Sequence, residues 1–155
     1  MITFAEPKDA YEIHRVMLAA FEEYRYIAAP SSALDETAAS IKSLLEDEKE
    51  RALIYWQADK AIGALRFKEQ EDALYFFRLS VRPEERGRKI ARQLLSALAD
   101  HAVSHGFNML RCQVRLSVRR NIALYEQEGF SISDRKTVIK PDGAEIETVF
   151  MTKNL

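Results

Sequence analysis

Residues 81–95 read Val81-Arg82-Pro83-Glu84-Glu85-Arg86-Gly87-Arg88-Lys89-Ile90-Ala91-Arg92-Gln93-Leu94-Leu95, and this stretch decides the fold. Pro83 cannot donate to a sheet ladder, so the apolar strand before it should end there. The amphipathic helix that follows should begin near Gly87, after the prolyl turn. A helix N-terminus presents unpaired backbone N–H groups and the positive end of the helix dipole. A strand, a basic turn that contains glycine, and a helix together predict a phosphate-binding cradle.

The turn itself resembles the acetyl-CoA signature of the GCN5-related N-acetyltransferases (the GNAT family), Gln/Arg-x-x-Gly-x-Gly/Ala. Its first and last positions match, whereas Lys89 stands where the family has glycine. Either a lysine backbone fits that turn, or the cofactor's pyrophosphate sits differently. The resemblance implies that the pyrophosphate contacts Arg86, Gly87, Arg88, Lys89, Ile90 and Ala91. A solvated basic helix face is the alternative interpretation.

A second stretch, Asn121-Ile122-Ala123-Leu124-Tyr125-Glu126-Gln127-Glu128-Gly129-Phe130, resembles a shortened version of the family's Asn-x-x-Ala-x-x-Leu-Tyr-x-x-x-Gly-Phe run. Asn121 and Tyr125 are four residues apart, so they lie on one face of a helix. The resemblance implies that Asn121 binds the pantetheine arm of the cofactor and that Tyr125 protonates the departing thiolate. Otherwise Tyr125 is a core aromatic residue and Asn121 a helix cap.

The family stabilises the reaction's oxyanion with backbone N–H groups of the strand before the cradle, which here are those of Leu79, Ser80 and Val81. Many members place on the same strand a carboxylate that acts as the general base, but residues 74–80 contain no Asp or Glu. The corresponding position falls on Tyr75, a poor base at neutral pH. The base is left open between a water relay, Glu69 and Glu71.

The acceptor pocket of the family is built near the end of the first helix, which here carries Tyr24 and Tyr26. Both tyrosines are therefore candidates for acceptor binding together with Tyr75, and core packing is an equal alternative for the first two. The three histidines and the acidic residues show no spacing typical of a metal site, so no metal is expected.

Composition favours one soluble domain. The 155 residues carry 30% charged side chains and a formal net charge of −1, so no overall field favours nucleic acid. Cys112 is the only cysteine, which fits a reducing compartment. The N-terminus lacks the layout of a signal peptide, and no apolar run approaches the ~20 residues that cross a membrane. We expect a cytoplasmic protein with a single N-acetyltransferase domain over residues 1–155.

Periodicity predicts the order β-α-α-β-β-β-α-β-α-β-β, which is an α/β (α+β) fold. Strands are expected at 2–5, 52–56, 61–67, 73–81, 109–116, 130–139 and 146–151. Helices are expected at 7–24, after Asp35 as an N-cap with an incomplete capping box, at 87–104 and at 118–127. The helix from Gly87 should be a right-handed crossover between parallel strands. The resemblance implies a mixed, mostly antiparallel GNAT-like sheet of six to seven strands with about four helices.

The resemblance implies an enzyme that moves an acetyl group from acetyl-CoA to a primary amine by direct attack in a ternary complex. The acceptor is a small-molecule amine or a peptide amine, and a homodimer is common in the family. A non-catalytic acyl-CoA-binding or sensor domain is the second interpretation, favoured by Lys89 and the missing strand carboxylate. A nucleic-acid module using Arg115, Arg119 and Arg120 ranks lowest, because no aromatic residue alternates with them. We expect neither a nucleic-acid nor a membrane partner.

Overall fold

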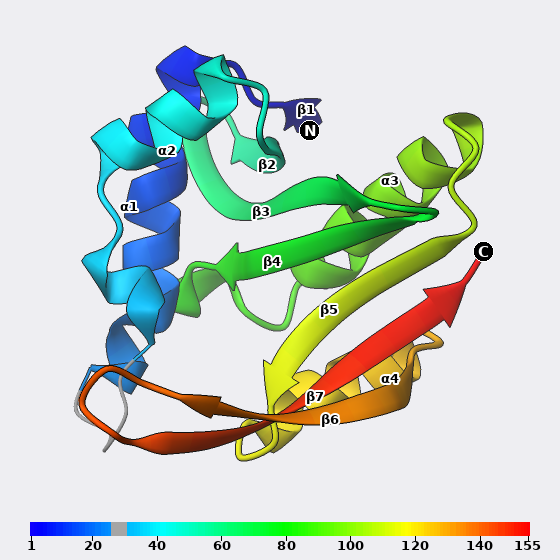
Figure 1. Cartoon of the computed structure of the whole chain (residues 1–155). Coiled ribbons are helices and arrows are strands. Elements are labelled where there is room, and N and C mark those ends of the chain that lie inside the picture. The colour runs from blue at the N-terminus through cyan, green and yellow to red at the C-terminus, as the bar shows by residue number, and fades with distance from the viewer. Residues whose placement is uncertain (26–30) are drawn as a thin grey trace.

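The computed structural model describes residues 1–25 and 31–155, in which helices cover both faces of a seven-stranded sheet (Figure 1). The strands are β1 (Ile2–Phe4), β2 (Arg51–Gln57), β3 (Lys60–Gln70), β4 (Ala73–Val81), β5 (Met109–Arg115), β6 (Ser131–Ile139) and β7 (Glu145–Asn154). The α-helices of these residues are α1 (Ala10–Phe21), α2 (Ala38–Glu46), α3 (Ile90–Ser104) and α4 (Arg119–Gln127). None of the described helices is long and apolar enough to cross a membrane.

The order of strands across the sheet is β1-β2-β3-β4-β5-β7-β6. β4 and β5 run parallel, and the other neighbouring pairs are antiparallel. α3 connects the two parallel strands, so the predicted crossover is confirmed. The predicted order of elements and the mostly antiparallel sheet are confirmed as well.

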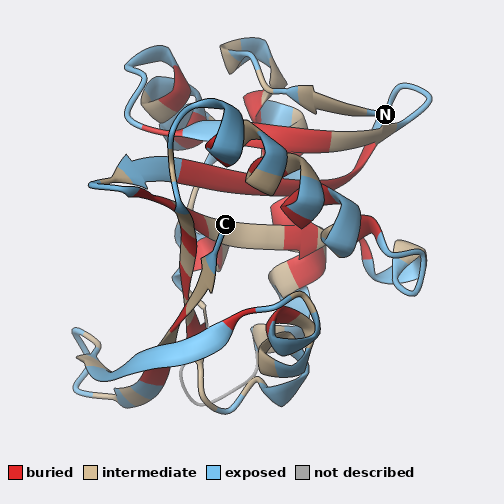
Figure 2. Ribbon diagram, turned by 90° about the vertical axis from the view of Figure 1, so that its right-hand side faces the viewer, coloured by how far each residue is buried: buried red, intermediate tan, exposed pale blue. Residues whose placement is uncertain are grey.

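Two apolar cores lie on opposite faces of the sheet, because successive strand residues point to opposite sides. In β2, Leu53 packs into the core beneath α3 and α4, whereas Ala52 and Ile54 pack into the core beneath α1 and α2. The buried residues gather in the central strands, while β6 is an exposed edge strand (Figure 2). The larger core, under α3 and α4, is the one that contains Tyr125.

Two local predictions are wrong. The N-cap of α2 is Thr37 instead of Asp35, and its hydroxyl accepts from Ser40 N–H at 3.0 Å, while Thr37 N–H is bonded to the Ser40 hydroxyl. Serine completes this capping box in place of the usual acidic or amide residue. The second error concerns α3, which begins at Ile90 and not near Gly87. Residues 83–85 form a 3₁₀ turn, and residues 86–89 form a separate turn before the helix.

Helix α3 lies very close to β3 at Gly63. A Cβ atom built on Gly63 would lie 2.7 Å from Cγ2 of Ile90 and 3.3 Å from Cδ1 of Leu94. Isoleucine has one strongly preferred χ1 rotamer in a helix, so Cγ2 of Ile90 cannot rotate out of the contact without cost. Glycine at position 63 therefore sets the distance between the sheet and the N-terminus of α3.

We expect Gly63→Ala to lower the free energy of unfolding by about 1–3 kcal/mol, the usual cost of overpacking a core. Urea denaturation followed by circular dichroism measures the change. The matched control is Gly63→Ala combined with Ile90→Leu, which removes the branched γ carbon and should restore much of the loss. Equal stability of Gly63→Ala and the unaltered protein would contradict this account of the packing.

Candidate active site

The site lies where β4 and β5 separate. The two strands pair only over Ala73–Tyr75 and Met109–Arg111. Beyond this pairing β4 contains a bulge, because Arg78 and Leu79 both stand opposite Leu65 of β3, and Arg78 has a φ of 53°. Bulges bend a strand and increase its twist. The separation leaves two cavities between the strands, α1 and α4.

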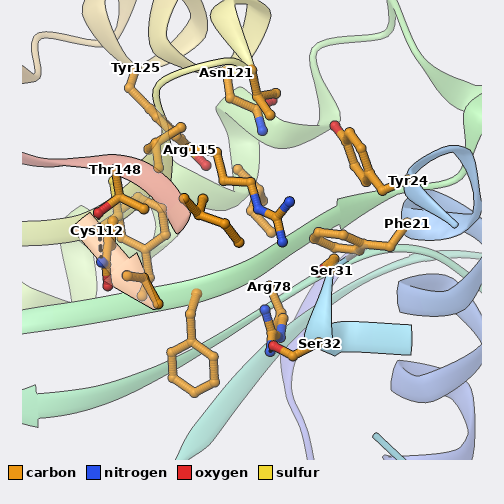
Figure 3. A pocket seen from close by; sticks show the side chains of 18 of the residues that line it. Phe21, Tyr24, Ser31, Ser32, Arg78, Cys112, Arg115, Asn121, Tyr125 and Thr148 are labelled. Carbon is orange, nitrogen blue, oxygen red and sulfur yellow. Dashed lines mark hydrogen bonds between the residues drawn. The ribbon is translucent and has the colours of Figure 1, made fainter. Parts of the chain in front are cut away.

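The first cavity has a volume of about 270 Å³ and is called the acceptor cavity. Its walls come from residues 75–79 of β4, residues 112–115 of β5, the end of α1 and the β6–β7 hairpin. Five of the predicted site residues line it: Tyr24, Tyr75, Leu79, Asn121 and Tyr125. Figure 3 shows Tyr125 and Asn121 entering it from α4, with Phe21 and Tyr24 on the α1 side. Tyr26 lies outside the described residues.

The second cavity, of about 210 Å³, leads from the first toward the cradle and is called the channel here. Its lining includes five of the predicted cofactor-binding residues: Leu79, Val81, Arg86, Ala91 and Asn121. Five residues line both cavities, so the two spaces meet there: Phe21, Tyr24, Leu79, Asn121 and Tyr125. The structure thus places strand β4, the cradle and α4 around two adjoining cavities.

The cradle turn consists of two left-handed residues separated by one. Gly87 has a φ of 86°, and Lys89, the N-cap of α3, has φ and ψ of 61° and 28°. Lys89 therefore adopts the backbone conformation for which glycine is usually chosen, which confirms that a lysine backbone fits this turn. The lysine side chain has no acceptor to cap the helix, so the N–H groups of the first turn remain available to an anion.

The side chains of the cradle residues differ in their partners and in their exposure. Arg86 donates to Glu23 at 3.0 Å, and Arg120 of α4 contacts the same carboxylate, so Glu23 ties the end of α1 to the cradle and to α4. Arg88 is bonded to Glu85 and Gln57. Ile90 is buried against Gly63, so only its backbone can reach a ligand in the cradle. Lys89 is exposed.

The backbone of β4 offers N–H groups to the site at alternate residues. Arg82 donates its N–H to Ile62 O of β3 at 2.9 Å. Backbone N–H groups alternate between the two edges of a strand, so the N–H of Val81 faces away from β3, toward the separation, whereas that of Ser80 faces β3. The Ser80 side chain is buried and donates to Arg78 O. Of the three predicted oxyanion donors, Ser80 is thus the one directed away from the site.

Tyr125 combines a core ring with a hydroxyl at the site. Its ring packs edge-on against Phe76 at 5.6 Å between centroids, and the residue is 6% exposed. Burial, and then the negative charge that Cys112 and Tyr24 would carry if ionised, raise the pKa of Tyr125 well above its usual value. The phenol therefore holds its proton at neutral pH, as a proton donor requires. Tyr125 therefore fits both interpretations of the sequence, because it packs in the apolar core and also lines the acceptor cavity.

No carboxylate lines the acceptor cavity among the residues that the structure describes. Glu69 and Glu71 are exposed at the β3–β4 hairpin, and neither belongs to its lining. Burial raises the pKa of Tyr75, and this makes it a still poorer base. Two other glutamates lie close by. Burial alone would raise the pKa of Glu23 and of Glu36, but their arginine partners outweigh it and hold both pKa values below the usual range.

An ion network that the sequence gave no reason to expect holds Arg78 at the cavity. Arg66, 2% exposed, donates to Glu50 at 2.6 Å and also contacts Glu36. Glu36 in turn accepts from Arg78 Nε at 2.7 Å, and Arg78 donates to the Ser32 hydroxyl at 3.0 Å. The segment before α2 is thereby bonded to the centre of the sheet and to the cavity wall.

Arg115 and Lys140 also line the acceptor cavity, and neither was predicted as a site residue. The one sequence signal was the concentration of basic residues from Arg115 to Arg120, which indicates charge without indicating where it points. Within the described part of the chain, no cluster of three or more His, Cys, Asp or Glu residues could hold a metal ion.

Comparison with known proteins identifies a family. The model of the Acetyltransferase (GNAT) family matches residues 11–130. No curated protein matches the chain. Many solved structures share the fold, among them the following three. A GNAT-family acetyltransferase from Streptococcus pneumoniae is 18% identical, with a TM-score of 0.79 over 100% of this chain and 99% of that one.

The second solved structure is a ribosomal-protein-alanine N-acetyltransferase from Brucella melitensis, 19% identical, with a TM-score of 0.81 over 100% of this chain and 99% of that one. The third, from Salmonella typhimurium, was solved with acetyl-CoA as its cofactor. It is 18% identical, with a TM-score of 0.79 over 100% of this chain and 93% of that one. At these identities the similarity shows a shared fold.

The left-handed backbone at Lys89 leads to a stability prediction. We expect Lys89→Val to lower the free energy of unfolding by about 1–2 kcal/mol, because a β-branched residue is strained at positive φ. Lys89→Gly should not lower the free energy of unfolding by more than about 1 kcal/mol, because glycine adopts positive φ without steric cost. Urea midpoints measure both, and Lys136→Val, at an exposed strand position that suits valine, is the control. A Lys89→Val variant as stable as the control would contradict the assigned turn.

Proposed function

The chain belongs to the GNAT acetyltransferase family, and on that premise we propose that it transfers an acetyl group from acetyl-CoA to a primary amine by direct attack in a ternary complex. The observation that carries the proposal is the meeting of the channel and the acceptor cavity at Leu79, Asn121 and Tyr125. One space starts at a phosphate cradle and the other is open to an acceptor. Two substrates bound in them would face each other at these residues. We take residues 1–155 as a single domain with this activity.

The residues of the channel and the cradle suit a CoA ester. The open space above Gly87, the left-handed turn and the N-terminus of α3 suit its pyrophosphate. Asn121 can bond the amide groups of its pantetheine arm from the wall shared by both cavities. Bound there, acetyl-CoA supplies an activated acetyl thioester. The solved structure from Salmonella typhimurium, which contains acetyl-CoA as its cofactor, supports the same assignment.

The chain's own groups then have separate tasks. Backbone N–H groups of Leu79 and Val81, at the separated edge of β4, stabilise negative charge on the carbonyl oxygen. Tyr125 holds a proton on Oη and donates it to the departing sulfur. Leu79 lines both cavities, and this supports a role for its backbone beside the reacting atoms.

The cysteine in the cavity supports direct transfer. Cys112 lines the acceptor cavity and is the only cysteine of the chain. Burial raises the pKa of its thiol to about 12, against a weaker opposing effect of a backbone hydrogen bond at Met151. The thiolate is the nucleophilic form, so at neutral pH this thiol is a poor acyl carrier. A direct attack by the amine needs no such carrier.

A non-catalytic acyl-CoA sensor is the second candidate, and the observation that favours it is that the described residues that line the acceptor cavity include no carboxylate. The two functions differ in turnover. A screen of primary amines with acetyl-CoA, followed by release of free thiol, tests the enzyme. The panel includes peptides with an N-terminal alanine, because one structural neighbour is named for an alanine of a ribosomal protein.

We expect Gly87→Val to weaken CoA binding at least tenfold, because a β-branched residue distorts a turn with a φ of 86°. Isothermal calorimetry with CoA measures the affinity. Gly106→Val is the matched control, since Gly106 has a φ of 82°, an added Cβ meets nothing within 4 Å at either glycine, and Gly106 lies just beyond the other end of α3. Unchanged affinity in a folded Gly87→Val protein would mean that the cradle lies elsewhere.

We expect Tyr125→Phe to lower kcat by ~10²-fold while CoA affinity stays nearly the same, because the change removes a proton donor and keeps the ring. Steady-state rates on one accepted amine, together with calorimetry, measure the two effects. Tyr11→Phe, on the exposed outer part of α1, is the matched control. Equal rates for Tyr125→Phe and the unaltered enzyme would reject the acid assignment, and no turnover in either would favour the sensor.

A further inference from the structure

Resting on the proposed function, we infer that the acceptor is a small amine that also carries a carboxylate, and that Arg115 binds this carboxylate together with Arg78 and Lys140. The three charged side chains that line the acceptor cavity are these cations, one each from β5, β4 and the turn that follows β6. Its lining contains no Asp or Glu among the described residues. A cavity wall with charges of one sign selects ligands of the other sign.

The excess of positive charge belongs to the lining of this cavity, whereas the protein as a whole is close to neutral. The formal net charge is −1, and an adjoining groove, which Arg115 also lines together with Arg119 and Arg120, contains three carboxylates, those of Glu23, Glu145 and Glu147. Basic residues are therefore balanced by acidic ones immediately outside the acceptor cavity. Among the described residues that line the cavity itself, the charged side chains are all cations, of which Arg78 is paired with Glu36 behind the wall.

Arg115 is held where its charge is poorly solvated. It is half-buried at the end of β5. Burial first, and then repulsion by Arg78, lower the pKa of its guanidinium below the usual value. Figure 3 shows both guanidinium groups reaching into the same space. A carboxylate between them would offset this repulsion.

Arg78 is positioned for this task by the network described above. Its Nε and one Nη are bonded to Glu36 and Ser32. A guanidinium has five N–H groups, so these two bonds fix its orientation and still leave donors for a ligand. Lys140 contributes from the opposite wall, formed by the β6–β7 hairpin.

The remaining lining limits the size and character of the acceptor. A cavity of about 270 Å³ lies just below the range typical of sites for drug-sized ligands, so it suits one small molecule. Phe21, Phe77, Val138 and Ile146 offer apolar surface beside the cations. This combination fits an amino acid with an apolar side chain better than the extended N-terminus of a peptide, whose first residue has no free carboxylate.

The same cations act on the acceptor's amine. The groups that face it are Arg78 from β4, Arg115 from β5, Lys140 from the hairpin turn, and the neutral Tyr24, Tyr75, Tyr125 and Cys112. Positive charge nearby disfavours an ammonium and lowers the pKa of the amine. A bound amine would thus lose its proton more readily although no carboxylate lines the cavity.

The test compares amines that differ in the carboxylate alone. L-phenylalanine is paired with 2-phenylethylamine and with L-phenylalaninamide, and L-leucine with isoamylamine and L-leucinamide, each with acetyl-CoA. The amino group of the acid is less basic than that of the simple amine and more basic than that of the amide. A preference for the acid over both partners therefore reflects its carboxylate and not the nucleophilicity of its amino group. We expect kcat/KM to be at least tenfold higher for the acids. Equal or higher values for the partners that lack a carboxylate would overturn the inference while keeping the acetyltransferase.

Arg115→Gln should reduce that preference at least tenfold, whereas Arg115→Lys, which keeps the charge, should retain part of it. Arg135→Gln is the matched control, because it removes the same charge from an exposed position on β6 and should leave the preference unchanged. A preference that survives Arg115→Gln would show that this arginine does not bind the carboxylate.

If no amine is acetylated, binding measurements test the inference that the cavity recognises a carboxylate. Calorimetry on the protein saturated with CoA would compare N-acetyl-L-phenylalanine with N-acetyl-L-phenylalaninamide. Tighter binding of the acid by tenfold or more, lost in Arg115→Gln, would support the inference even though the absence of turnover rejects the proposed function. Equal binding of the two would overturn the inference.

Discussion

The parallel pairing of β4 with β5 ends after three residues, and the site depends on this limit. A fully paired β4 would bond its backbone along both edges and would leave neither a cavity nor an N–H edge facing it. The bulge at Arg78 bends β4 away from β5 while the strand keeps its pairing with β3 as far as Val81. The backbone strain of a non-glycine residue at positive φ thus stands beside the functional surface, where such strain is commonly found.

A buried ion network fixes the bent strand. Burial alone would lower the pKa of Arg66, but Glu50 and Glu36 outweigh it, so the pKa is raised and the guanidinium stays charged in the interior. Removing one partner of such a group leaves an uncompensated buried charge, which is far more costly than the net value of the pair. Because Glu36 is shared with Arg78, the charge at the cavity wall and the integrity of the interior belong to one network.

The sequence predicted the order of elements because apolar periodicity and turn residues are local signals. The ends of β4 at Ala73 and Val81 followed from a polar turn on one side and Pro83 on the other. Thr37 was missed as a cap, since the box closes with Ser40, and the start of α3 was misplaced because Lys89 takes a glycine-like conformation. The contributions of Arg115, Lys140 and Glu36 depend on distant segments meeting at the separated strands, which no local pattern encodes.

Among the described residues no carboxylate lines the acceptor cavity, and this raises the question of how an acceptor amine would lose its proton. A carboxylate base attracts an ammonium, so it stabilises the form of the amine that cannot react before it removes the proton. Cations act in the opposite sense, because they disfavour the ammonium from the moment of binding, but they also repel an acceptor that has no other charge. An anionic group on the acceptor removes this conflict, since it supplies the attraction that the amine lacks. On the proposed function, an anionic acceptor would account both for the three cations and for the absence of a carboxylate among the described residues that line the cavity.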